Sequence, residues 1–279
     1  MQNELCSERI AQMKFFGELL VLLDSEMKTP QMYGWFHLLF FALSIILGVW
    51  LCLKFKKPDD KTVKRIIFII TTITIVLEIY KQINYTFTYN GEEILSDFQW
   101  YAFPFQFCSM PMYVGLLASI VKKGKVYDAL CAFLATFAVF AGVCVMLYPA
   151  QVFIGTIGIN IQTMICHGSM ISIGIFLLGS GYVKSEHKTI FSAIPVFACC
   201  VIAAMVMNEI AYRSGLLESE TFNMFFISPY CEPSLPVYSI VQGVVPFPWC
   251  LFIYVGAFSL AAYVMLLISM LAHRIAKKK

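Results

Sequence analysis

Charge is scarce in this sequence. Only 13% of its 279 residues are Asp, Glu, Lys or Arg, whereas 59% are apolar or aromatic, and the mean hydropathy is +0.76. A soluble globular domain carries about 25% charged residues, so the composition excludes an ordinary soluble domain. The net charge is only +3, which excludes a strongly basic nucleic-acid-binding protein, and the apolar content excludes intrinsic disorder. The composition predicts a protein that spans the membrane several times.

Long hydrophobic stretches are what the sequence has instead. A helix needs about 20 mainly apolar residues to cross a bilayer, and these stretches do not alternate with period two as the strands of a membrane barrel do. We therefore predict an all-α fold, a polytopic bundle of seven transmembrane helices. They lie at Tyr33–Leu53, Arg65–Ile83, Phe103–Val121, Val126–Leu147, Ile159–Gly179, Thr189–Asn208 and Pro246–Leu271.

Basic residues are distributed unequally between the two sides of this bundle. Fifteen of the 20 Lys and Arg residues fall in the loops at 54–65, 122–125 and 184–188 and in the C-terminal tail. Because basic residues are retained on the cytoplasmic side, we expect an external N-terminus and a cytoplasmic C-terminus. The domain plan is then one membrane domain at 33–271 with an external loop at 209–245, followed by a basic cytoplasmic tail at 272–279.

Residues 1–32 lack the features of a cleaved secretory signal, so we predict that they are retained as an external segment. Apolar residues between Ile10 and Leu23 recur at helical spacing. This pattern predicts an amphipathic helix at the membrane interface. A helix packed over the outer ends of the bundle is the alternative.

Polar residues are rare inside the predicted spans, and those present fall in the outer halves. Ionisable groups within the membrane are costly and usually mark function, so one shared cavity open to the outside is the expectation. The structural alternative is that these groups only hydrogen-bond between helices, each bond contributing about 0.6 kcal/mol. The residues concerned are His37, Glu78, Gln82, Cys108, Asn160, Thr163, His167 and Asn208.

Metal-binding spacings are missing: no C-x-x-C pair and no His-rich cluster occurs among the ten cysteines and four histidines. Most cysteines, Cys166 among them, lie in apolar stretches where a thiol acts as a small hydrophobic group. Cys108 differs because it is expected near a helix N-terminus, whose positive end favours a thiolate. His167 is the candidate base for it.

Several segments resemble the YwaF-like integral membrane family, which is related to the animal transmembrane protein 164. The similar segments are VLEIYKQI (Val76–Ile83), YAFPFQFCSMPMYVGLL (Tyr101–Leu117), IQTMICHGSMI (Ile161–Ile171), and the stretch from Asn208 through FNMFF (Phe222–Phe226) to VVPFPWCLFIY (Val244–Tyr254). They occur in the family's order over about three quarters of the chain.

The resemblance implies a seven-helix fold shared with membrane lipid enzymes. The animal relative is similar to a cysteine-dependent acyltransferase that loads acyl chains onto lysophospholipids. Carried over by position, the resemblance points to Glu78, Cys108 and His167. Two departures are visible: Phe105 stands where the animal protein has its thiol, with Cys108 three residues later on the same helix face, and Gln106 stands where relatives often have His.

The function these features favour is a phospholipid acyltransferase or lipid acyl hydrolase. His167 would deprotonate Cys108, and the thiolate would attack a phospholipid ester. Glu78 or Asn160 would orient the imidazole.

Amide side chains complete the expected cavity. Asn208 or Asn223 would hydrogen-bond to the developing oxyanion, while Gln82 and Gln106 would add to its polar lining. This reaction needs no cofactor and no metal; its partners are phospholipids of the cell membrane and not nucleic acid, and the sequence makes no prediction of the oligomeric state.

Two alternatives remain at this stage. In one, His37, Glu78 and His167 hold a catalytic zinc ion. In the other, the outer cavity belongs to a transporter or receptor that binds a small or lipidic ligand without turnover.

Overall fold

Helices make up most of the structure, a computed structural model that describes residues 2–215, 217, 221–232 and 235–277. Six helical stretches in this part of the chain are long and apolar enough to cross a membrane. They are α2 (Trp35–Lys54), α3 (Asp60–Thr86), α5 (Lys125–Ala135) continued by α6 (Phe137–Leu147), α7 (Ile157–Gly179), α8 (Lys188–Ser214) and α10 (Trp249–Lys277). These elements confirm a helical, multi-pass membrane protein.

The third predicted span is shorter than expected. Its helical part, the 3-10 turn η2 (Phe107–Ser109) followed by α4 (Met110–Ile120), is below the length that crosses a bilayer. Pro104 disfavours a helical conformation at Phe103, whereas Pro111 lies in the first turn of α4, where no backbone N–H is needed. Seven full-length spans are therefore not confirmed.

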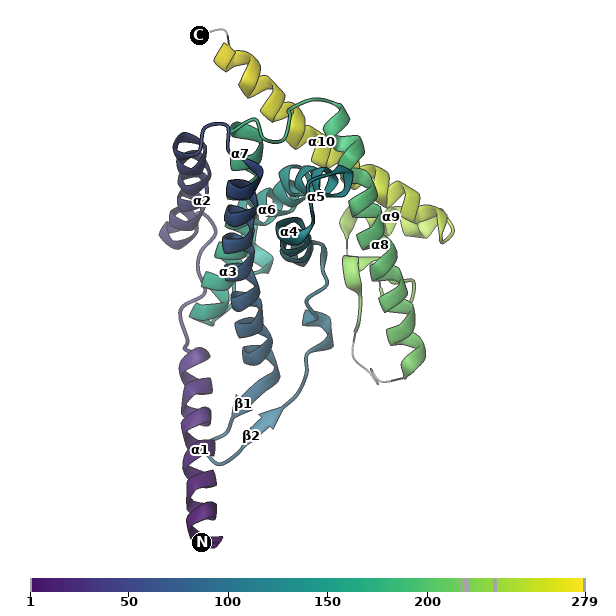
Figure 1. Ribbon diagram of the computed structural model, residues 1–279. Helices are drawn as coiled ribbons and strands as arrows, with labels where there is room; N and C mark the ends of the chain where they lie inside the picture. Colours follow the sequence, from purple (N-terminus) through teal and green to yellow (C-terminus); the bar gives the residue numbers. More distant parts are fainter. Residues whose placement is uncertain (1, 216, 218–220, 233–234, 278–279) are drawn as a thin grey trace.

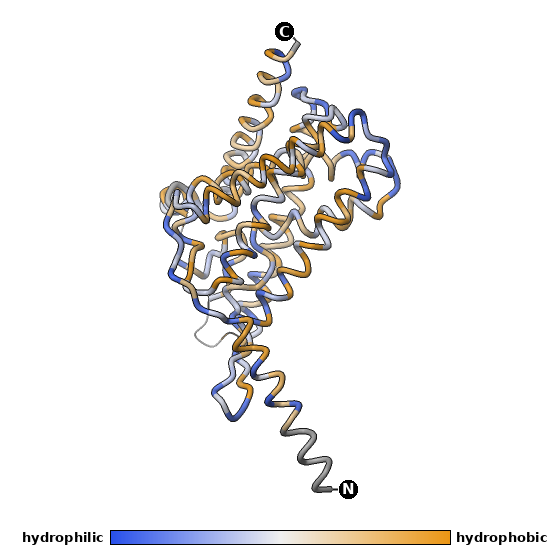
Figure 2. The backbone as a smooth tube through the Cα atoms, turned by 90° about the vertical axis from the view of Figure 1, so that its left-hand side faces the viewer, coloured by the Kyte–Doolittle hydropathy of each residue, from blue (hydrophilic) through white to orange (hydrophobic). Residues whose placement is uncertain are grey.

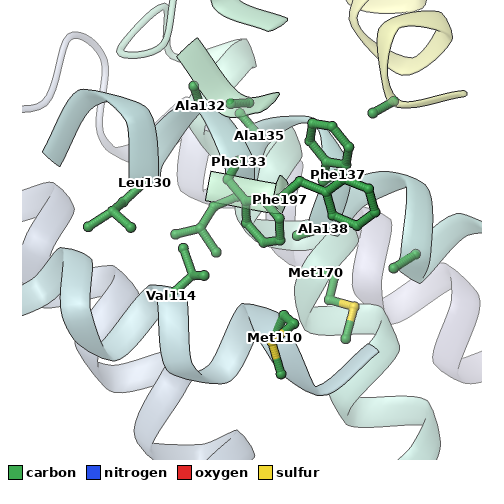
Figure 3. Close-up of a cluster of buried hydrophobic side chains, with 14 of the residues drawn as sticks. Met110, Val114, Leu130, Ala132, Phe133, Ala135, Phe137, Ala138, Met170 and Phe197 are labelled. Carbon is green, nitrogen blue, oxygen red and sulfur yellow. The ribbon is translucent and has the colours of Figure 1, made fainter. Parts of the chain in front are cut away.

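The helices form two groups with shorter helices between them (Figure 1). Helices α2, α3 and α7 pack together on one side, α8 and α10 lie on the other, and α4, α5 and α6 fill the middle. The main core lies where α4, α5, α6 and α8 meet, and Figure 3 shows Phe133, Phe137 and Phe197 gathered there. The rings of Phe137 and Phe197 are stacked with centroids 4.6 Å apart.

One end of the bundle, which we call the basic end, brings together the loops at 54–65, 121–125 and 180–188. Lys123 joins them, because its ammonium lies 2.9 Å from Asp128, 3.5 Å from Asp60 and 3.2 Å from the hydroxyl of Tyr182. Figure 2 shows hydrophobic residues predominating along the bundle helices and hydrophilic ones gathering in the loops. Most of the basic residues counted in the sequence thus share one end.

The opposite end, the hairpin end, carries the small β-structure and the N-terminal helix. Strands β1 (Phe87–Tyr89) and β2 (Ile94–Ser96) pair antiparallel, and the 3-10 turns η1 (Trp100–Ala102) and η3 (Pro149–Gln151) lie close to the ends of the neighbouring helices. The chain is therefore not purely α-helical. Helix α1 (Gln2–Leu23) extends beyond the bundle (Figures 1 and 2) and packs on the hairpin, where a Cβ at Gly17 would lie 2.5 Å from the Tyr89 ring. Its placement at a lipid interface stays a prediction.

The long segment expected as the external loop 209–245 has internal structure. Helix α8 continues to Ser214, the turn η4 (Met224–Phe226) follows, and α9 (Pro236–Val244) precedes α10. Met224, Phe225 and Ile227 are fully buried. The middle of this segment therefore folds back into the protein and forms part of its core.

Candidate functional site

A cavity of about 280 Å³ lies between α3, α7 and the start of α4. Four of the residues selected from the sequence line it: Glu78, Cys108, Thr163 and His167. Its apolar side is formed by core residues of α5, α6 and α7, such as Leu134, Ala138 and Met170. Chemically reactive side chains therefore face a small enclosed space at the boundary of the hydrophobic core.

His167 is buried in this cavity with one nitrogen unused. Its Nδ1 lies 2.7 Å from the carbonyl oxygen of Thr163, one turn earlier in α7. A carbonyl oxygen only accepts, so Nδ1 carries the proton and Nε2 carries the lone pair. Nε2 has no hydrogen-bond partner among the described residues. A buried polar atom without a partner costs free energy, and here it is the atom that a general base would use.

Cys108 reaches the same cavity from a different element. It lies in η2, directly before α4, because the chain ahead of it is kept out of a helix at Pro104. The N-terminal end of a helix carries partial positive charge, which stabilises an anion such as a thiolate. The fold thus brings Cys108 and His167, the two residues that the resemblance pointed to, to one cavity.

Glu78 lies beside them but is already paired. Its carboxylate lies 2.7 Å from the ammonium of Lys81 and accepts hydrogen bonds from Gln82 (2.8 Å) and Gln162 (3.3 Å). The expected role of Glu78 in orienting the imidazole is therefore wrong for this structure. The Thr163 carbonyl takes that place, because α7 itself presents it one turn before His167.

Sequence reasoning missed several polar residues that line the cavity, and three of them lie next to Glu78 or His167. Cys166 and Gln162 both line the cavity, and the Gln162 amide donates to the Cys166 sulfur at 3.6 Å. Their spacing of four residues on α7, next to Thr163 and His167, was the available signal. Lys81 also lines the cavity, three residues after Glu78 on α3.

His37 and Asn160 do not line this cavity but join chain segments. His37 accepts from the Tyr33 N–H at 3.0 Å and donates to the Met146 carbonyl at 2.8 Å, so both ring nitrogens are used. Asn160 exchanges two hydrogen bonds with the backbone of Ile154. Within the described part of the chain, no three His, Cys, Asp or Glu side chains form a group that could hold a metal ion. The zinc alternative therefore lacks a ligand set.

Three of the amide residues expected at the cavity instead lie around the buried segment at η4, whereas Gln82 donates to Glu78 and to the Ala102 carbonyl. Asn208 exchanges hydrogen bonds of 3.1 and 2.8 Å with the backbone of Met224, and Gln106 bonds the backbone of Asn223 and Phe225 at 2.9 Å each. All three amides, from Gln106, Asn208 and Asn223, line a separate, more open groove of about 810 Å³. The shared cavity expected from the sequence is thus two spaces.

A protein-family model matches the part of the chain that forms both the cavity and the groove. The model of the TMEM164 family matches residues 30–267. The chain belongs to the TMEM164 family. The match spans α2 to α9 and most of α10, and so includes every residue of the cavity and the groove, whereas α1 precedes it.

This membership confirms the expected relationship to transmembrane protein 164, and the narrower assignment to the YwaF-like family stays a prediction. No curated protein and no solved structure matches the chain. The case for a particular chemistry in this TMEM164 family member therefore depends on the site itself.

Proposed function

We propose that this protein is a phospholipid acyltransferase or lipid acyl hydrolase of the cell membrane, with Cys108 as nucleophile and His167 as general base. The observation that supports this most is the unpartnered Nε2 of His167 in a cavity that Cys108 also lines. A base whose tautomer is fixed by its other nitrogen is prepared to take a proton at Nε2.

The proposed reaction has two steps. In the first, Nε2 of His167 takes the thiol proton of Cys108, and the thiolate attacks the ester carbonyl of a phospholipid. The ester C–O bond breaks, the lysophospholipid leaves with the proton from the imidazolium, and the acyl group remains as a thioester. In the second, His167 deprotonates an acceptor hydroxyl or water, which attacks the thioester and releases the Cys108 thiolate as the C–S bond breaks; the thiolate then takes back the proton.

Donors for the oxyanion are available in the cavity. The Ser109 hydroxyl lines it, and so does the Gln162 amide, which here donates to Glu78 and Cys166. They replace Asn208 and Asn223 in this role because those two amides line the groove and not the cavity. Preorganised donors of this kind stabilise the charge that develops on a carbonyl oxygen.

We also propose that the cavity opens toward the external side. The three basic loops meet at the other end of the bundle, and basic residues mark the cytoplasmic side of membrane proteins. On this basis the N-terminus is external and the C-terminus cytoplasmic.

The test is an assay of purified protein in lipid nanodiscs. The substrates are phosphatidylcholine with a labelled acyl chain and an unlabelled lysophospholipid, and the products measured are labelled phospholipid and free fatty acid. We expect Cys108→Ala and His167→Ala each to lower the turnover at least 100-fold, because removing a nucleophile or a general base costs several orders of magnitude. Wild-type protein should carry a hydroxylamine-sensitive acyl group on Cys108.

Cys166→Ala is the matched control, since Cys166 lines the same cavity. We expect this variant to keep its activity. If Cys108→Ala retains turnover while Cys166→Ala loses it, the nucleophile assignment is wrong. If the wild type shows no acyl transfer and no hydrolysis, the proposed enzyme activity is wrong.

A further inference from the structure

The groove lined by Gln106, Asn208 and Asn223 is rich in aromatic side chains. Tyr101, Tyr212, Phe226 and Tyr230 all line it and stay between 40% and 59% exposed. Tyr212 and Tyr230 stack face to face, with centroids 3.6 Å apart. Each ring of this pair covers one face of the other, so these two rings offer only their outer faces to a ligand, in addition to the exposed rings of Tyr101 and Phe226.

The charge at this groove is negative. Glu232 lines the groove and is exposed, and the hydroxyl of Tyr230 donates to the carboxylate of Glu209 at 2.5 Å. The lining residues in the described part of the chain include no Lys or Arg. The nearby Arg213 is paired with Glu209 one turn earlier in α8. An anion would meet no cationic side chain among these described lining residues, whereas a cation would meet a carboxylate and several ring faces.

We propose that this groove binds the ammonium group of a phospholipid headgroup. Aromatic rings attract alkylammonium ions through their quadrupole, and aromatic cages are the usual recognition site for quaternary ammonium ligands. Glu232 supplies the complementary charge. Choline and ethanolamine headgroups both carry such a group, whereas a glycerol headgroup does not.

The position of Tyr101 connects the groove with the cavity, because this residue lines both. A phospholipid whose ammonium group lies in the groove would extend its ester past Tyr101 toward Cys108. The inference rests on the proposed function in this respect: the groove would select by headgroup the lipid whose ester reaches the thiol.

Binding is measured without turnover, in the full-length Cys108→Ala protein in detergent. Short-chain dihexanoyl lipids with choline, ethanolamine or glycerol headgroups are titrated by calorimetry. We expect the choline lipid to bind at least tenfold more tightly than the glycerol lipid, with the ethanolamine lipid nearer to choline than to glycerol. Equal affinity for the choline and glycerol lipids would overturn the proposal.

Tyrosine is generally enriched at membrane interfaces. Variants of the groove test whether its tyrosines bind a headgroup or are there only for that reason. Tyr212→Leu and Glu232→Gln should each weaken choline-lipid binding about threefold to tenfold, and leave glycerol-lipid binding unchanged. Tyr148→Leu and Glu92→Gln remove an exposed tyrosine and an exposed glutamate outside the groove and should change neither. If Tyr212→Leu and Glu232→Gln both behave like these controls, the groove is not the headgroup site.

The binding assay and the turnover assay fail separately. A headgroup preference in the Cys108→Ala protein together with an inactive wild type would leave the groove assignment standing and remove the enzyme. Transfer activity in the wild type without any headgroup preference in the Cys108→Ala protein would leave the proposed enzyme standing and remove the groove assignment.

Discussion

The two histidines inside the predicted spans, His37 and His167, show how differently one residue type is used. Both were selected from the sequence because they lie in the outer halves of predicted spans. His37 uses both ring nitrogens on backbone partners, whereas Nε2 of His167 has no partner in the part of the chain that the structure describes. The sequence alone gives no sign of this difference, since it depends on which backbone groups the fold presents to each ring.

His37 stabilises the end of α6. The carbonyl of Met146 is in the last turn of that helix, where no intrahelical N–H is available, and the His37 Nε2–H is its partner. We predict that His37→Ala lowers the free energy of unfolding by about 1–3 kcal/mol, because a buried carbonyl and the Tyr33 N–H lose their partner. Titration with a denaturing detergent measures this change.

His167→Ala is the contrasting variant. It should abolish acyl turnover but lower the free energy of unfolding less than His37→Ala does, because only the Thr163 carbonyl loses a side-chain contact. Should His37→Ala abolish turnover while the protein stays fully folded, His37 would belong to the chemistry and the assignment of the two roles would be wrong.

At the scale of helices, the position of His167 depends on close packing of α6 against α7. Gly142 of α6 faces the backbone of α7: a Cβ at this position would lie 2.7 Å from the His167 carbonyl oxygen and 2.9 Å from the Met170 Cβ. Small residues allow helix backbones in membranes to approach closely. The contact at Gly142 therefore fixes the distance between α6 and α7 next to the proposed base, His167.

We predict that Gly142→Ala reduces turnover at least tenfold while the protein still folds. The added methyl group must push α7 away, and an overpacked core costs about 1–3 kcal/mol; a displacement of about 1 Å at a catalytic group costs about 100-fold in rate. The nanodisc assay measures the turnover, and detergent titration measures the stability.

Gly256→Ala in α10 is the control, because beyond the local helix backbone no atom of the described residues lies within 4 Å of the added Cβ. It should leave activity unchanged. Unchanged turnover in Gly142→Ala as well would show that the α6–α7 contact does not position His167.

At this scale the sequence predicted the hydrophobic elements well and their interruptions poorly. The stretch Ile159–Gly179 differs from α7 by only two residues at its start, because apolar residues and length define it. The third span was expected from Phe103, yet the helix begins near Phe107, because Pro104 has more influence than local hydrophobicity.

The site was predictable only in part for a related reason. The position of His167 and Cys108 in the outer halves of their spans followed from counting residues. The separation of Gln106, Asn208 and Asn223 from the cavity did not, because it results from the buried turn η4, whose backbone Asn208 and Gln106 bond across 16 and 119 residues of sequence. Long-range backbone partners leave no periodic signal in the sequence.

The whole molecule is asymmetric along the bundle axis. Lys123 joins three basic loops at one end, whereas the cavity, the hairpin and the extended helix α1 lie at the other. Within the second half, Lys81 is paired with Glu78 and Arg213 with Glu209. This distribution predicts one preferred orientation, since basic loops are retained on the cytoplasmic side.

We predict that the hairpin end is external, and the labelling of introduced cysteines measures this. Lys56→Cys places a thiol in an exposed basic loop, and Glu92→Cys places one in the exposed hairpin turn. In intact cells a membrane-impermeant maleimide should label Glu92→Cys above the level of the parent chain, and Lys56→Cys only after the membrane is permeabilised. The parent chain measures labelling of the native cysteines. Labelling of Lys56→Cys but not Glu92→Cys in intact cells would invert the topology and move the Cys108 cavity to the cytoplasmic leaflet, where the lipids that reach it would differ.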